Sequence, residues 1–150
     1  MIDVDLLARF PLFKDVTPAI LERIASASRE IVLGSGEAVF REGQNADRLH
    51  FLLEGSIALR VAIMSKPDSL TVSFVSQPYQ CFGWSGIVPP HHYTATAYCE
   101  EPSHIMVVSA NDFMKIIADR PADGFVIMQR VAELISNRLR NSRETMLKTL

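Results

Sequence analysis

The feature that most constrains the fold of this chain is a change of hydrophobic periodicity at two points. Between Glu30 and Val108 the apolar residues occur in short runs, rich in Val, Ile, Leu, Phe and Thr, which Gly, Pro, Asn, Asp or Ser separate. Seven of these runs predict strands: Ile31–Leu33, Ala38–Arg41, Leu49–Leu53, Ile57–Met64, Leu70–Val75, Tyr93–Cys99 and His104–Val108. Before and after that stretch the apolar residues recur at the three- and four-residue spacing of amphipathic helices. Many short strands at this spacing predict a sandwich, a jelly roll or a barrel, here with helices at both ends.

Local signals mark where these elements begin and end. Pro11 ends a first helical turn, because a proline disfavours helix at the residue before it. Thr17-Pro18 predicts a second helix start, with Thr as the N-cap and Pro in the first turn. Leu53-Glu54-Gly55-Ser56 predicts a tight hairpin between two strands, and Ser109 is expected to cap a later helix that Pro121 interrupts. We expect one domain over residues 1–150, with helices over about 3–28, a β-roll over about 30–108 and helices over about 109–148.

Composition excludes several classes of protein. With 48% hydrophobic residues and a formal net charge of −2, the chain is not expected to be disordered. No run approaches the roughly 18 apolar residues of a membrane span. The first residues carry no basic segment of a secretory signal, so we expect a cytoplasmic location. In that setting Cys81 and Cys99 are expected to be free thiols in the core.

The most informative segment runs from Cys81 to Ala95. Gly83 and Gly86 flank small residues in a loop between two strand runs. Such glycines let the backbone approach a ligand and turn N–H groups toward an anion. They also fit an ordinary glycine turn, and the spacing alone does not choose between these two interpretations.

Four segments taken in order point to a known family. They are Leu7–Phe13, Gly36–Gly43, Leu49–Ile57, and Phe82-Gly83 followed by Thr94-Ala95. Together they resemble the motifs of the cyclic-nucleotide-binding domain, the sensor half of CRP/FNR-type regulators, and the resemblance covers about residues 6–145. It implies a mainly β fold with flanking helices (α+β): an eight-stranded, jelly-roll-like β-roll with N-terminal helices and a long C-terminal helix. It also implies a non-enzymatic, ligand-sensing regulatory module.

The resemblance further implies a phosphate-binding cassette at eight residues. They are Phe82, Gly83, Trp84, Ser85, Gly86, Tyr93, Thr94 and Ala95. In the family pattern a Glu that accepts the ribose hydroxyl stands where this chain has Trp84. An Arg that binds the cyclic phosphate stands where this chain has Tyr93. Because both charged groups are missing, we expect binding of cAMP or cGMP to be weak or absent. Any ligand that does bind is expected to use backbone N–H groups of Gly83, Ser85 and Gly86 and the Thr94 hydroxyl, with Trp84 and Tyr93 as walls.

Three interpretations of this altered cassette stay open. The pocket is silent, and the domain serves a structural or protein-interaction role. It takes another small anionic or aromatic ligand. Or it binds a cyclic nucleotide through backbone groups and His91 or His92.

Enzymatic functions find less support. Gly83-Trp84-Ser85-Gly86 is one residue short of the nucleophile-elbow pattern. A cupin-type metal enzyme would need a His-x-His pair, whereas His91 and His92 are adjacent and would point to opposite faces of a strand. We therefore predict no catalytic residues and no metal site.

The C-terminal helix carries an apolar stripe and several arginines. The stripe predicts a homodimer seam through Met128, Val131, Ile135, Leu139 and Met146. The resemblance implies that a ligand signal would reach this helix near Met128–Ile135. The 150 residues contain no winged helix-turn-helix after that helix, so no DNA-binding module is expected in this chain.

Overall fold

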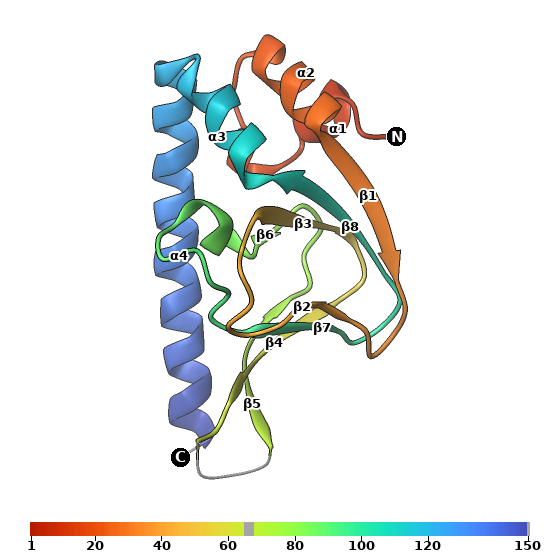
Figure 1. The fold of residues 1–150 in the computed structure, drawn as a ribbon, viewed down its shortest axis with the longest axis vertical. Coiled ribbons are helices and arrows are strands. Elements are labelled where there is room, and N and C mark those ends of the chain that lie inside the picture. Colours follow the sequence, from red (N-terminus) through yellow and green to blue (C-terminus); the bar gives the residue numbers. More distant parts are fainter. Residues whose placement is uncertain (65–67, 150) are drawn as a thin grey trace.

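Two four-stranded antiparallel sheets form the centre of the computed structural model, which describes residues 1–64 and 68–149 (Figure 1). The strands are β1 (Ser28–Leu33), β2 (Ala38–Phe40), β3 (Arg48–Glu54), β4 (Ile57–Ala62), β5 (Ser69–Val75), β6 (Cys81–Phe82), β7 (Thr96–Cys99) and β8 (Ser103–Ser109). The helices are α1 (Val4–Leu7), the 3-10 helix η1 (Pro11–Phe13), α2 (Pro18–Ala27), the 3-10 helix η2 (Trp84–Ile87), α3 (Ala110–Ala118) and α4 (Pro121–Thr149). The predicted fold class and the helix–strand–helix order are confirmed.

The strand pairing is that of a long two-stranded ribbon rolled up on itself. One sheet has the order β1-β8-β3-β6 and the other has β2-β7-β4-β5. The first strand therefore pairs with the last, the second with the seventh, and so on inward to β4 and β5. This is the jelly roll that the resemblance implied.

The predicted hairpin at residues 53–56 is wrong. Gly55 has the positive φ of 114° that a turn requires, but β3 and β4 belong to different sheets. The turn is a corner at which the chain crosses from one sheet to the other. A Cβ on Gly55 would lie 2.2 Å from Oγ of Ser103, and the same Oγ accepts a hydrogen bond from the Ser56 N–H at 3.3 Å. Only glycine fits so tight a corner.

The segment before β7 also differs from the prediction. A strand was expected from Tyr93 onward, but β7 begins at Thr96, and the two-residue strand β6 was not anticipated. Tyr93 exchanges backbone hydrogen bonds with the turn after β2, donating to the Gln44 carbonyl and accepting from the Gly43 N–H. Its ring is packed between the sheets, so this segment serves as a wall of the roll rather than as a regular strand.

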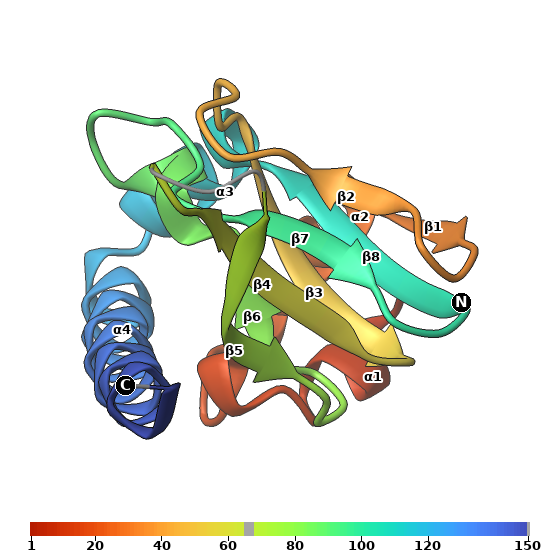
Figure 2. The same ribbon diagram turned by 90° about the horizontal axis from the view of Figure 1, so that it is seen from below.

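Strand β3 is buried on both of its faces. Leu49 and Phe51 pack under the helices, whereas His50 and Leu52 point between the sheets, as the alternation of a strand requires. At the helical end, Ser109 caps α3 as predicted, accepting a hydrogen bond from the Asp112 N–H at 3.3 Å. Figure 2 shows α4 end-on beside the two sheets, with one side turned away from them. Among the helices of the described residues, none combines the length and the apolar character needed to cross a membrane.

Candidate functional site

The cassette predicted from the sequence lies in the connection between β6 and β7, next to α4 (Figure 1). Gly83 turns the chain out of β6 with a φ of 70°, and η2 follows directly. Residues from both ends of this connection line one small cavity of about 40 Å³. The lining residues are Phe40, Leu59, Gly83, Trp84, Ser85, Tyr93, Thr94, Ala95 and Arg138. The structure thus brings six of the eight predicted cassette residues together, while Phe82 lies in the core between the sheets and Gly86 under α3.

The two cassette glycines have packing reasons. A Cβ on Gly83 would lie 2.6 Å from Nδ1 of His50 and 2.9 Å from the Phe40 ring. A Cβ on Gly86 would lie 2.8 Å from the Arg48 carbonyl oxygen. Close packing of the loop against the roll therefore requires glycine at both positions, independently of any role of their N–H groups in ligand binding.

Tyr93 closes one side of the site. Its ring stacks on Phe40 with centroids 3.9 Å apart, and its hydroxyl donates to the Arg48 carbonyl at 3.4 Å. Burial raises the pKa of this phenol above its usual value, so the side chain is neutral at physiological pH. At the position where the family pattern has a cation, this chain has a neutral ring held in the inter-sheet core.

His50 lies behind the cassette. Its ring is buried among Phe40, Phe82 and Tyr93. Burial, and secondarily the charge of Arg48, lower its pKa from 6.5 to about 3. Within the described part of the chain its Nδ1 has no hydrogen-bond partner. His50 is therefore a neutral core residue.

Arg138 of α4 also lines the cavity, although it is not part of the cassette motif. Its side chain is only 8% exposed, and its guanidinium carbon lies 5.2 Å from the centre of the Trp84 ring. Its Nη1 is buried and finds no hydrogen-bond partner among residues 1–64 and 68–149. The sequence feature that could have pointed to Arg138 is its helical spacing. Arg138 stands seven residues after the buried Val131 and therefore shares its face of α4.

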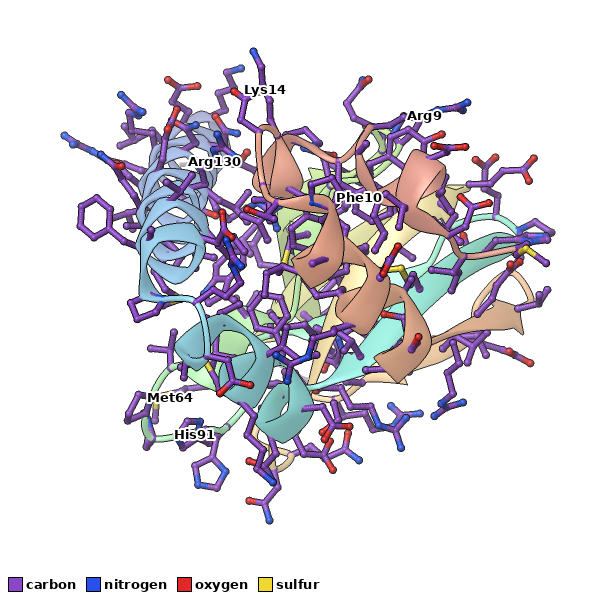
Figure 3. The ribbon with its side chains drawn as sticks, turned by 90° about the horizontal axis from the view of Figure 1, so that it is seen from above. Arg9, Phe10, Lys14, Met64, His91 and Arg130 are labelled. Atoms are coloured by element: carbon purple, nitrogen blue, oxygen red, sulfur yellow. The ribbon has the colours of Figure 1, made fainter. Side chains whose placement is uncertain are left out.

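The other chemistry-bearing side chains are scattered. His91 and His92 are exposed residues of the loop. Nδ1 of His91, which Figure 3 labels, lies 3.1 Å from the Ser85 carbonyl oxygen. His104 pairs with Glu30 at 2.7 Å on the sheet of β1 and β8. Among the residues described, no three His, Cys, Asp or Glu side chains gather into a metal site. Both cysteines are buried free thiols, and burial raises the pKa of Cys81 to about 12.

The five residues of the predicted dimer seam divide between two faces of α4. Val131 is buried in the core, and Met128 and Ile135 are half-buried against it. Leu139 and Met146 are exposed. Val131 is therefore unavailable to a partner, because it already packs against the chain's own core.

These features together define a recognised class of domain. The family described as the cyclic nucleotide-binding domain matches residues 30–120, and the chain belongs to that family. A putative cyclic nucleotide-binding protein from Geobacter metallireducens has the same fold, with a TM-score of 0.80 and 30% identity over 93% of this chain and 99% of that one.

Curated relatives are regulators and channels. A CRP-like cAMP-activated global transcriptional regulator from Mycobacterium tuberculosis is 24% identical over 95% of this chain and 61% of its own length. A cyclic nucleotide-gated potassium channel from Mesorhizobium japonicum is 25% identical over 77% of this chain and 30% of its own length. This chain therefore spans less than two thirds of either relative.

Proposed function

We propose that this chain is a non-enzymatic regulatory domain whose altered cassette does not bind cAMP or cGMP in the manner of its family. The observation that carries the proposal is the stack of Tyr93 on Phe40, 3.9 Å apart, where the resemblance places a phosphate-binding arginine. A cyclic phosphate in that space would lie against an apolar ring and leave its charge without a partner. Each lost charge-assisted hydrogen bond weakens binding by roughly 1.5–3 kcal/mol, or about 10–100-fold.

The size of the cavity supports the same proposal. One water molecule needs roughly 10–15 Å³ of cavity volume, so a cavity of about 40 Å³ has room for a few waters. A base, a sugar and a phosphate need several times that space. The ligand that fits the described conformation is a small one.

Trp84 provides the direct test, since it is the single tryptophan of the chain and lines the cavity. We expect no saturable change in its fluorescence, and no rise in melting temperature, with cAMP, cGMP or cyclic dinucleotides. Binding at micromolar concentrations, seen by both methods, would overturn the proposal. The silent pocket remains the competing interpretation, and a response to any small ligand at this cavity excludes it.

We further propose that the protein is a homodimer through the outer face of α4. An exposed apolar residue recurs at every seventh position of this face, which is the spacing of one coiled-coil position over three heptads. These residues are Phe125, Ala132, Leu139 and Met146. Met128 and Ile135 follow at the three-residue offset of the second position and complete the seam. This seam keeps four of the five residues predicted from the sequence and replaces Val131. A second copy of α4 matches this face, because the same spacing on both helices lets the side chains interdigitate.

A further inference from the structure

Arg138 is a buried cation that has no anionic partner among the described residues. The ion pairs among the described residues do not include it, and its contact with the Trp84 ring satisfies none of its N–H groups by conventional hydrogen bonds. The nearby Cys81 thiol supplies no negative charge, because burial raises its pKa to about 12. Burying an unpaired charge is costly, so such a group usually has a partner.

Hydroxyl groups and aromatic rings surround Arg138 in the cavity. It lines the same cavity as Ser85 and Thr94, whose hydroxyls are hydrogen-bond donors. The remaining wall is largely aromatic and apolar, and apolar surroundings strengthen the attraction between a guanidinium and an anion. A guanidinium presents its donors as a planar fork that matches two oxygens of a carboxylate or a phosphate.

We propose that Arg138, with the hydroxyls of Ser85 and Thr94, forms a binding site for a small oxyanion of carboxylate or phosphate type. The inference rests on the proposed function, since a pocket filled by a cyclic nucleotide would leave no room for it. The cation comes from α4 rather than from the cassette. A bound oxyanion would therefore tie the cassette to the helix that we assign to dimerisation.

The experiment measures Trp84 fluorescence and melting temperature during titration of the purified chain at constant ionic strength. One arm uses acetate and formate, the other inorganic phosphate and sulfate, with chloride as the reference. We expect saturation at about 1 mM in one arm, a typical scale for a ligand of a few heavy atoms. The arm that saturates tells whether the oxyanion is a carboxylate or a phosphate.

Variants at Arg138 separate an anion site from a packing role. Arg138→Gln should raise the melting temperature without anion, because it removes a buried unpaired charge, and should abolish the response to anion. Arg143→Gln, at an exposed position of the same helix, should respond as the wild type does. Arg138→Lys, which keeps the charge and loses the fork, should bind about 10-fold more weakly or worse.

Three results would overturn the inference. The first is the absence of a response in both arms, and the second is an undiminished response of Arg138→Gln. If Arg138→Gln does not fold, the third is an anion affinity of Arg138→Lys equal to that of the wild type. A separate cAMP titration keeps the two proposals distinguishable. Tight cAMP binding contradicts the proposed function, whereas silence toward oxyanions contradicts only the role of Arg138.

Discussion

The ring of His50 is neutral because burial among aromatic rings removes the water that would stabilise a charged imidazolium. It lies among three aromatic rings, and its pKa of about 3 is far below the 6.5 of an unfolded chain. Below pH 6.5 the unfolded chain takes up a proton at His50 and the folded protein does not. Acid therefore favours the unfolded state, and this loss of stability levels off only below about pH 3.

The pH dependence of stability tests this account of His50. Between about pH 6 and pH 4 the free energy of unfolding should fall by roughly 1.4 kcal/mol per pH unit on account of this one residue. Urea titrations should show a shallower fall in His50→Gln. They should show the wild-type slope in His92→Gln, whose side chain is exposed. Equal slopes in wild type and His50→Gln would contradict the account.

Gly86 gives a second prediction at the scale of one residue. An added methyl group there would lie 2.8 Å from the Arg48 carbonyl oxygen and 3.1 Å from Cβ of Ala110. Gly86→Ala should therefore cost about 1–3 kcal/mol of unfolding free energy. Gly34→Ala is the matched control, because its nearest neighbour is 3.9 Å away, and it should be close to neutral. A neutral Gly86→Ala would show that the loop is not held against the roll.

The residue scale also shows what the sequence could foretell about the site. The replacement of the family's Glu and Arg was readable from Trp84 and Tyr93 once the motifs were aligned. The sequence also places Arg138 on the same helix face as Val131, but it does not show that this face is the buried one. The stack of Tyr93 on Phe40 and the small size of the cavity were not readable, because they depend on packing between strands that are far apart in the chain.

At the scale of elements, α4 has two apolar faces with different partners. One packs on the core through Val131 and Ile127, and the other exposes Leu139, which is 70% exposed, and Met146. One apolar stripe was predicted because residues 128, 131, 135, 139 and 146 fall within a narrow arc of a helix. Only the position of the roll reveals which side of that arc is covered.

A charge on the outer face should separate the dimer. Leu139→Glu should give a monomer by sedimentation at tens of micromolar, while its melting behaviour shows that the fold is kept. Asn141→Glu places the same charge at another exposed position and should leave the dimer intact. A wild-type protein that sediments as a monomer would contradict the proposed seam.

The strands show where local sequence patterns suffice. Runs of β-branched and aromatic residues predicted seven strands close to their observed positions, because such residues favour strands and turn residues bound each run. The two-residue β6 is too short to carry such a pattern. The sequence predicts a hairpin at Gly55 because a hairpin and a corner between two sheets both need a positive φ there. Only the strand pairing distinguishes the two, since β3 pairs with β8 and not with β4.

At the scale of the whole molecule, α4 contacts both the N-terminal segment and the cassette. Arg130 donates to the carbonyl oxygens of Leu12, at 3.3 Å, and of Lys14, so that the helix is held to the N-terminal segment (Figure 3). Asp123 accepts a hydrogen bond from the Thr17 N–H at 3.4 Å, and hydrogen bonding from Thr17 lowers the pKa of this carboxyl. Further along, Arg138 lies over Trp84. The N-terminal segment and the cassette thus hold α4 in place, in addition to its packing against β5 and α3.

Loss of the Arg130 contacts should loosen the whole helix. Arg130→Gln removes two hydrogen bonds to carbonyl oxygens and should cost about 1–2 kcal/mol of unfolding free energy. Hydrogen exchange of the α4 amides should become faster in this variant. Arg143→Gln, an exposed arginine on the same helix, should leave exchange as in the wild type. Unchanged exchange in Arg130→Gln would mean that the roll alone positions α4.

The central claim is that nucleotide binding is lost because Trp84 and Tyr93 replace the charged residues of the family's pocket. One calorimetric comparison tests this claim. The wild type and the double variant Trp84→Glu, Tyr93→Arg are titrated with cAMP, after their melting curves show that both are folded. The account predicts no heat of binding for the wild type up to about 1 mM, and saturable binding for the double variant, which regains both charged groups. Micromolar binding by the wild type, or silence from a folded double variant, would contradict it.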